Sequence, residues 1–426
     1  MTIHVVKPGD TVYSIARMHD VPMRRIVVDN GLQEPARLTP GQTLVILKPK
    51  RVYTVQAGDT LGNIASRTGV TVFQLWQNNP QLGGNDRIYP GQQLVIEYDG
   101  VKKGVFAVKG YAYPNIDRAI LRKTLPYLTY LAVFSFGVQP DGSLVYIDDR
   151  GLPEAAREFG AVPLMVLTTL AEDGSFSGER ASQFLNNPDA QEKLIDNLID
   201  CLQKRGYGGV DVDFEFIPPA DRERYAAFLS NLTTRLNAVG LTVMAALAAK
   251  TSAAQKGLLH EAHDYALIGQ AVNDVLLMTY EWGYSRSEPM AVAPLDQVRA
   301  VVRYAASVIP TDKIFLGIPN YGYDWTLPHV PGQSVARTIG NVEAVEQAIN
   351  QGADIEYDET AQTPHYQYYR DRVQHEVWFE DARSIQAKLN LAREFGLRGI
   401  GVWNIMRYFP QLWMVLCSQY AIKKVV

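Results

Sequence analysis

The sequence predicts an α/β protein built on a (β/α)8 TIM barrel with a small α+β insertion, preceded by two small βααβ units. From Gly104 onward, short apolar runs alternate with amphipathic stretches, which is the pattern of repeated βα units. Before Gly104, one sequence pattern occurs twice, which indicates an internal repeat. In addition, one of the expected barrel strands carries three carboxyl groups on a single face. The chain is therefore expected to place an acidic site inside a barrel.

Composition sets the class of protein. The chain has 426 residues with 47% hydrophobic content, enough for one large core plus small modules. Its net charge of -4 argues against a nucleic-acid-binding protein, which would show basic patches. The sequence contains no run of 18 apolar residues, so no membrane span is expected. The chain enters a structured pattern at once, so no signal peptide is expected. Cys201 and Cys417 lie among apolar neighbours and are expected to be buried thiols.

The repeat fills the first hundred residues. His4 to Val12 returns as Tyr53 to Leu61, and Pro40 to Ile46 returns as Pro90 to Ile96. Each copy opens with a short strand and a Gly-Asp-Thr turn that can cap a helix. A second helix, expected over Pro22 to Asn30 and over Thr71 to Asn78, precedes a closing strand. The two units are expected at residues 1–48 and 51–98.

These units resemble LysM domains, which bind N-acetylglucosamine chains in peptidoglycan and chitin. In that family a shallow groove is lined by the loop after the first strand and the loop between the second helix and second strand. The resemblance implies that glycan binds near Gly9, Asp10, Thr11 and Asn30 in the first unit and near Gly58, Asp59, Thr60 and Asn78 in the second. The first unit is also mildly basic, which favours a salt-sensitive attraction to anionic peptidoglycan.

The barrel is expected over residues 102–426. The eight candidate strands are Val105 to Gly110, Tyr130 to Phe136, Val162 to Thr168, Gly209 to Phe216, Val243 to Leu247, Val275 to Tyr280, Ile314 to Pro319 and Gly399 to Trp403. Enzymes with this fold place their chemistry at the C-terminal ends of the strands. Residues at those ends are therefore the first candidates for a site.

The fourth strand carries the acid row, which comprises Asp211, Asp213 and Glu215. These residues alternate with Val210, Val212, Phe214 and Phe216, so the carboxyls share one face of the strand and stand roughly 7 Å apart. In a sheltered site such neighbours cannot all ionise at low cost, and at least one pKa rises, as a general acid requires. The alternatives are a solvated strand face and a calcium site. The apolar opposite face and the straight, alternating strand favour catalysis over both.

The acid row resembles the D-x-x-D-x-D-x-E signature of glycoside hydrolase family 18, the chitinase-like enzymes. Gly208 stands where the family usually has its first Asp, which is a departure that affects the support of the row. The resemblance implies that Glu215 protonates the leaving oxygen, Asp213 orients the substrate's acetamido group, and Asp211 shares a proton with Asp213.

Two further strand ends fit the same family. Met278 to Trp282 resembles its M-x-Y-D motif, which implies that Tyr280 bonds the acetamido oxygen and that Glu281 replaces the usual Asp. Trp403 stands where the family keeps a tryptophan beneath the reacting sugar. Buried core aromatics are the alternative for both Tyr280 and Trp403, and the company of the acid row favours the site.

An insertion is expected at residues 324–379, with a helix from Val342 to Gln351. Its candidate strands are Asp354 to Tyr357, Tyr366 to Tyr369 and Glu376 to Phe379, and Tyr366, Tyr368 and Tyr369 either stack on sugars or pack the lobe. His260 and His263 are three residues apart rather than the four of a zinc motif, so they are expected on a helix surface. Neither a metal ion nor a cofactor is expected.

The mechanism implied by the resemblance is retaining and substrate-assisted, because the acids lie on one strand face and are poorly placed to flank a bond. Two LysM-like units before such a barrel resemble the spore cortex-lytic N-acetylglucosaminidases of endospore-forming bacteria. This implies peptidoglycan as partner and the spore coat or cortex as location. Cortex muramic lactam holds its nitrogen in a ring, so the reacting sugar would be N-acetylglucosamine. The alternatives are a chitinase, an inactive lectin-like barrel and a structural spore-coat protein.

Overall fold

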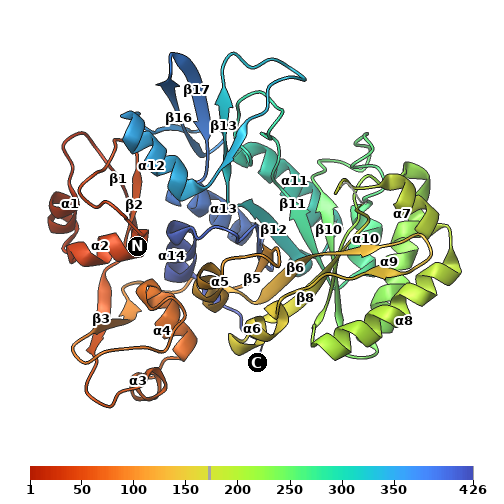
Figure 1. Cartoon of the computed structure of the whole chain (residues 1–426), viewed down its shortest axis with the longest axis horizontal. Coiled ribbons are helices and arrows are strands. Elements are labelled where there is room, and N and C mark those ends of the chain that lie inside the picture. The colour runs from red at the N-terminus through yellow and green to blue at the C-terminus, as the bar shows by residue number, and fades with distance from the viewer. Residues whose placement is uncertain (171–173, 426) are drawn as a thin grey trace.

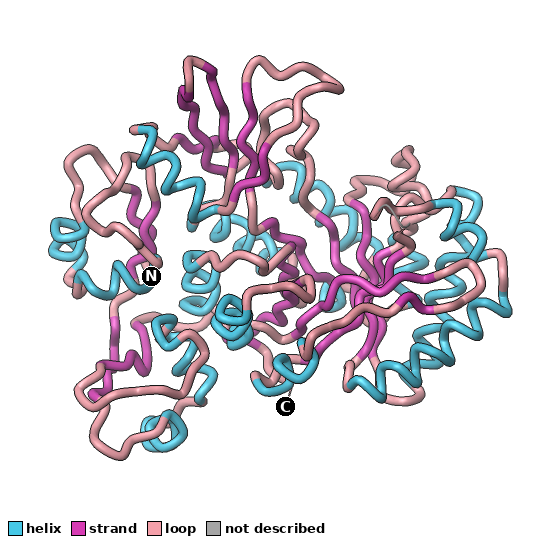
Figure 2. The backbone as a smooth tube through the Cα atoms, viewed as in Figure 1, coloured by secondary structure: helices cyan, strands magenta, loops and turns pink. Residues whose placement is uncertain are grey.

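The computed structural model describes residues 1–170 and 174–425. Two small units stack on one side of the chain, a barrel fills the other side, and a small lobe stands above both (Figure 1). The tube in Figure 2 shows the barrel strands gathered at the centre of the large domain, with helices around them. No helix in the described ranges is long and apolar enough to cross a membrane.

Each small unit is a two-stranded antiparallel sheet with two helices. The first comprises β1 (Thr2–Val5), α1 (Val12–His19), α2 (Met23–Asn30) and β2 (Thr43–Ile46), and the second comprises β3 (Pro49–Thr54), α3 (Leu61–Thr68), α4 (Val72–Asn78) and β4 (Gln93–Tyr98). In both units a threonine caps the first helix: Thr11 accepts from the Ser14 amide and Thr60 from the Asn63 amide. The predicted βααβ order is confirmed for both copies.

The barrel consists of eight parallel strands, as predicted. They are β5 (Val105–Ala112), β6 (Tyr130–Val138), β8 (Val162–Thr168), β9 (Gly209–Asp213), β10 (Thr242–Ala248), β11 (Asp274–Met278), β12 (Ile314–Pro319) and β18 (Gly399–Trp403). Because β5 pairs with both β6 and β18, the sheet closes on itself and has no free edge between these strands. Two short strands pair alongside the barrel strands: β7 (Leu144–Val145) is antiparallel to β6, and β19 (Ala421–Ile422) is parallel to β5.

Helices surround this barrel. They are α5 (Arg118–Thr124), α6 (Leu152–Glu158), α7 (Gly178–Leu185), α8 (Pro188–Arg205), α9 (Arg222–Asn237), α10 (Tyr265–Ala271), α11 (Leu295–Val308), α13 (Ala382–Glu394) and α14 (Pro410–Gln419). Outward strand residues such as Val210, Val212 and Val243 pack against these helices, and inward residues such as Ala132, Val166 and Phe315 fill the barrel. The alternation along each strand therefore separates an outer core from an inner one.

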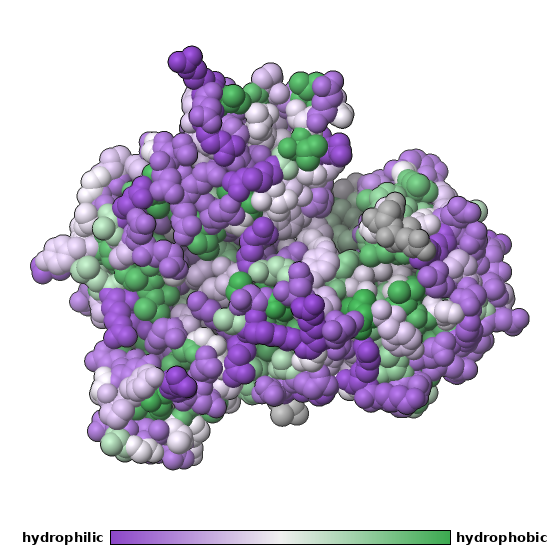
Figure 3. All heavy atoms as spheres, in the orientation of Figure 1, coloured by the Kyte–Doolittle hydropathy of each residue, from purple (hydrophilic) through white to green (hydrophobic). Residues whose placement is uncertain are grey.

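The lobe is inserted between β12 and α13. It contains β13 (Gly322–Thr326), β14 (Arg337–Ile339), α12 (Asn341–Gln351), β15 (Glu356–Asp358), β16 (Thr363–Arg370) and β17 (Val373–Trp378), in the sheet order β14-β13-β17-β16-β15. The sequence predicted the helix and the last three strands but missed β13 and β14. Polar side chains dominate the face of β16 and β17 seen in Figure 3.

Both small units are docked on the large domain, the first by a backbone hydrogen bond as well as by side chains and the second through side chains. From the first unit, the Thr39 hydroxyl donates to the Ala353 carbonyl (2.8 Å), and the Pro40 carbonyl accepts from the Ile355 amide (2.9 Å). In the second unit, the Trp76 ring packs on Phe159, with their centroids 5.0 Å apart.

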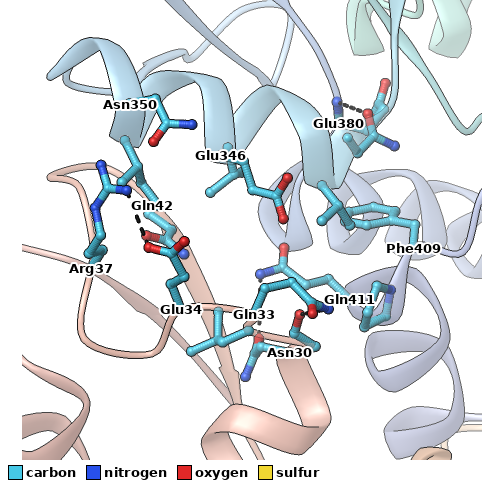
Figure 4. A pocket seen from close by; sticks show the side chains of 17 residues that line it. Asn30, Gln33, Glu34, Arg37, Gln42, Glu346, Asn350, Glu380, Phe409 and Gln411 are labelled. Atoms are coloured by element: carbon cyan, nitrogen blue, oxygen red, sulfur yellow. Dashed lines mark hydrogen bonds and ion pairs between the residues drawn. The ribbon is translucent and has the colours of Figure 1, made fainter.

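A cavity of about 210 Å³ marks the junction of the first unit with α12 and α14 (Figure 4). Gln411, from α14, reaches across to the first unit and donates to the Thr43 carbonyl at 2.6 Å. Glu34 and Arg37 pair at the rim (3.2 Å), opposite Glu346 of α12. The junction is thus formed by three separate parts of the chain.

We expect Gly41→Ala to loosen this docking. Gly41 has φ +82, and an added Cβ there would overlap the carbonyl oxygen of Ile355. Gly91 holds the same place in the second unit with φ +85, and its Cβ would meet nothing within 4 Å. Both alanines carry the strain of a left-handed conformation, about 1–2 kcal/mol. Only Gly41→Ala adds the collision.

The test compares thermal unfolding and proteolysis between β2 and β3 for the two variants. The docking assignment requires a clearly lower Tm and faster cleavage for Gly41→Ala than for Gly91→Ala. Equal losses would mean that the Gly41 contact does not hold the first unit in place.

Candidate active site

The acid row begins on β9 and continues into the loop that follows it. Asp211 and Asp213 point into the barrel and are buried, as predicted. The strand ends at Asp213, however, so the predicted extent to Phe216 is wrong. Phe214 leaves the strand to pack in the outer core against Phe184 and Phe228. Phe216 is not in a buried apolar row: it is 37% exposed and has φ 56, because the chain turns there. Glu215 therefore lies just beyond the strand, at the barrel mouth.

Asp211 is held by two donors from β5. Lys109 Nζ donates to Asp211 Oδ2 at 2.8 Å, and the Tyr111 hydroxyl donates to the same oxygen at 2.6 Å. All three side chains are almost completely buried. The other Asp211 oxygen, Oδ1, has no hydrogen-bond partner in the described ranges, and the same is true of Asp213 Oδ1.

The electrostatics of Asp213 and Glu215 favour protonated carboxyls. Burial raises the pKa of Asp213 well above its ordinary value, and the charges of Glu215 and Asp211 raise it further. Burial also raises the pKa of Glu215 to about 7, with a smaller contribution from Glu281. Within residues 1–170 and 174–425, no group forms a hydrogen bond with the Glu215 carboxyl. Glu215 can therefore hold a proton at neutral pH and present it to a ligand.

Asp213 and Glu215 open into a cavity of about 530 Å³ at the C-terminal end of the barrel. Tyr280 and Glu281 line it just after β11, and Trp403 lines it at the end of β18. The structure therefore brings together every barrel residue predicted for the site except Asp211, which lies beneath the cavity floor and contacts the cavity-lining Tyr111. The cavity is large enough for sugar rings and is apolar over much of its wall.

Trp403 and Glu281 are each fixed by neighbours. The Trp403 ring meets Tyr111 and Phe134 edge to face, with centroids 5.3 and 5.1 Å apart. Glu281, which has φ 68, accepts hydrogen bonds from the hydroxyls of Tyr321 and Tyr323. Because Tyr323 lies on β13, the lobe helps to hold this side of the cavity.

The side chains of His260 and His263 lie in different surroundings. His263 accepts the Ala248 amide on Nδ1 (2.9 Å), so its Nε2 carries hydrogen and donates to the Phe214 carbonyl (2.9 Å). It is buried between β10 and the Glu215 loop, which corrects its predicted place on a helix surface. His260 instead lines the cavity.

The lobe tyrosines divide in two. Tyr366 and Tyr368 are buried, with hydroxyls donating to the Ala344 carbonyl and to Asp324, so they pack the lobe. Tyr369 is 66% exposed. None of the three lines the cavity beside the acid row.

Gly208 lies just before β9. A Cβ at this position would overlap a methyl group of Val162. A carboxyl side chain here would therefore require Val162 to move.

In the small units, most residues implied by the LysM resemblance hold the loops in shape. Asp10 accepts from the Lys7 amide and Asp59 from the Gln56 amide, which closes the turn in each unit. Gly9 and Gly58 both have φ +87, and a Cβ would meet nothing within 4 Å. Their backbone is therefore open to solvent, whereas Thr11 and Thr60 serve as helix caps.

The asparagines need one correction. Asn30 is buried and bonds the Ile26 and Val45 carbonyls and the Val45 amide. In the second unit Asn79 makes the matching bonds to Leu75 and Val95, so Asn79 and not Asn78 is its counterpart. Both asparagines tie the second helix to the closing strand, which leaves their amides little freedom to meet a glycan.

Lys109 and Tyr111 are the main residues that the sequence reasoning missed. A signal for them exists: Lys109 is a single charge within the apolar run Val105 to Ala112, at even spacing from Tyr111. A lysine in a strand buried on both sides needs a partner, and an acid row on another strand supplies one.

Comparison with known proteins agrees with this geometry. Glycosyl hydrolases family 18 matches residues 115–407, and the LysM domain matches residues 4–47 and 53–97. The cortical fragment-lytic enzyme of Bacillus subtilis (strain 168) is 38% identical over 432 residues, covering 100% of this chain and 99% of that protein. That of Bacillus anthracis is 39% identical over 430 residues, covering 99% of each. The crystal structure of the Bacillus megaterium QM B1551 spore cortex-lytic enzyme SleL aligns with a TM-score of 0.84 at 38% identity, covering 100% of this chain and 99% of that one.

Proposed function

Because the chain belongs to glycosyl hydrolases family 18 and carries two LysM domains, we propose that it is a spore cortex N-acetylglucosaminidase with a retaining, substrate-assisted mechanism. The observation that carries this proposal is the acid row itself. Asp213 and Glu215 line one cavity with Tyr280 and Trp403, and the pKa of Glu215 is raised to about 7.

The chemistry follows from the positions of these groups. Glu215, protonated at neutral pH, donates its proton to the glycosidic oxygen as the bond breaks. Asp213 accepts a hydrogen bond from the N–H of the substrate's acetamido group, whose oxygen attacks the anomeric carbon. Tyr280 has no hydrogen-bond partner among the described residues and is free to hold that oxygen in line. Water, activated by Glu215 as a base, then opens the cyclised sugar with net retention.

The substrate class rests on the full-length relatives and on chemistry. Both curated relatives reported above are cortical fragment-lytic enzymes that share the whole architecture of this chain. In cortex, muramic lactam cannot supply a free acetamido group, so the reacting sugar is N-acetylglucosamine. The LysM domains would hold the enzyme on the glycan, with the spore coat or cortex as its location.

The deciding experiment digests purified spore cortex and chitin side by side and identifies the products by mass. Cleavage after N-acetylglucosamine in cortex, with little release from chitin, is the expected result. Preferential chitin cleavage would favour a chitinase. Binding to both polymers without any product would favour an inactive lectin-like or structural spore-coat protein.

We expect Glu281→Gln to shift the alkaline limb of the pH profile of kcat downward. The negative charge of Glu281 contributes to the raised pKa of Glu215, so its removal lets Glu215 lose its proton at a lower pH. The shift should be much smaller than the whole rise of the Glu215 pKa from 4.5 to about 7, since burial is the larger cause of that rise. Glu356→Gln, at an exposed lobe residue, is the control and should leave the limb in place. An unchanged limb in Glu281→Gln would show that Glu281 does not influence the proton donor.

A further inference from the structure

Lys109 is a charged side chain in the interior of the barrel. It is 0% exposed, and its ammonium lies over the rings of Tyr111 and Phe315, 5.2 and 5.7 Å from their centroids. Removing an ammonium from water costs several kcal/mol unless a partner compensates for it. The partner is Asp211, so this cation and the acid row are placed together.

The hydrogen bonds to Asp211 are one-sided. Lys109 and Tyr111 both donate to Oδ2, and Oδ1 of Asp211 is left without a partner in the described part of the chain. A carboxylate with one oxygen held by an ammonium and a hydroxyl has a fixed orientation. Its free oxygen remains available to receive a proton.

The charged and titratable groups around Lys109 come from three sides. Asp211, Asp213 and Glu215 come from β9 and its loop, Tyr111 from β5, and Tyr280 follows β11. Asp274 begins β11 and pairs with Arg398 at 2.9 Å, so its charge is already compensated. Within the described ranges, Lys109 is therefore the cation that contacts the acid row.

We propose that Lys109 is a positioning residue that orients Asp211 and keeps one negative charge on the Asp211 and Asp213 pair during turnover. The inference rests on the proposed function and deepens it. With Lys109 present, the pair holds one proton, which can pass between the two carboxyls as Asp213 meets the charged intermediate. The charge of Lys109 lowers the pKa of Asp213, so without Lys109 Asp213 is protonated at a higher pH and the negative charge that stabilises the intermediate is lost.

The test is the pH profile of kcat for Lys109→Gln, which removes the charge but keeps a donor of similar reach. We expect its acid limb to move up by about one pH unit or more, because an opposite charge in contact shifts a carboxyl pKa by ~1–3 units. The alkaline limb should stay in place, since burial and Glu281, not Lys109, set the pKa of Glu215. KM for oligosaccharide should change little, because Lys109 does not touch the cavity.

Lys388→Gln is the matched control. Lys388 and Glu380 form another fully buried ion pair, at 2.8 Å, whose residues do not line the acid-row cavity. If Lys109 is only structural, both variants lose stability and neither profile moves. A folded Lys109→Gln protein with the wild-type acid limb overturns the inference. Absence of wild-type turnover on both cortex and chitin would instead refute the proposed function.

Asp211→Asn gives a second route if Lys109→Gln does not fold. Asp213 would then have to carry the negative charge by itself, without contact to Lys109 and in a buried position that raises its pKa, so the acid limb should move up. An acid limb that stays at the wild-type pH in this variant contradicts the inference as well.

Discussion

Glu215→Gln is expected to lower kcat on cortex glycan by about 100-fold or more, because an amide keeps the shape of the side chain but cannot donate a proton as an acid. The loss should be much smaller on an aryl glycoside with a good leaving group, since such an oxygen departs without protonation. Steady-state kinetics on both substrates measure the contrast. Near-wild-type turnover on the natural glycan would remove Glu215 as the acid.

Stability provides the control for this variant. The folded-state pKa of Glu215 is raised to about 7, above its ordinary 4.5, so ionisation destabilises the folded state as pH rises through that window. The glutamine has no such charge, and its Tm should equal the wild type at low pH and exceed it above pH 7. A lower Tm at every pH would mean that the kinetic loss reflects damage to the fold.

The sequence predicted the barrel well because each strand reports its own burial. Alternation along β9 places Asp211 and Asp213 inside and Val210 and Val212 outside without any knowledge of the neighbouring strands. It could not show that the strand stops at Asp213. The pairing of β9 with β8 ends at Asp213, opposite Thr168, where β8 itself ends.

The sequence also could not predict contacts between residues that lie far apart along the chain. Lys109 lies 102 residues before Asp211, and its role is visible only once β5 and β9 face each other across the barrel. The docking of the first LysM domain depends similarly on Thr39 and Ala353, which are 314 residues apart. A local pattern predicts which side chains are buried and cannot say what they meet.

In the LysM domains, the motif predicted the position of the turn but not the roles of all its residues. The Gly-Asp-Thr turn was located correctly in both domains, but Asp10 and Asp59 close the turn through backbone amides. The asparagine register slipped by one because Asn78 and Asn79 stand together in the second domain. Only hydrogen bonds to the closing strand identify Asn79 as the counterpart of Asn30.

Asp213→Asn should separate binding of the intermediate from binding of the substrate. If the acetamido group is the nucleophile, a thiazoline analogue of N-acetylglucosamine mimics the cyclised, positively charged intermediate and should inhibit competitively. Asp213→Asn should weaken this inhibitor by ~10-fold or more while changing oligosaccharide affinity little, because only the cyclised form places positive charge beside the carboxylate. Inhibition constants and binding isotherms for both ligands give the comparison.

Asp274→Asn is the control, because it also removes a buried carboxylate but one that does not line the cavity. Asp274 lies at the start of β11, and the cavity is lined by Met278 at the other end of that strand. Asp274→Asn should leave the ratio of the two affinities unchanged. Incubation with a fluorosugar supplies the opposing evidence: a covalent adduct on Asp213 or any other carboxylate, detected by mass spectrometry, would establish an enzyme nucleophile. No adduct, together with a selective loss of thiazoline binding, is the result that a substrate-assisted mechanism requires.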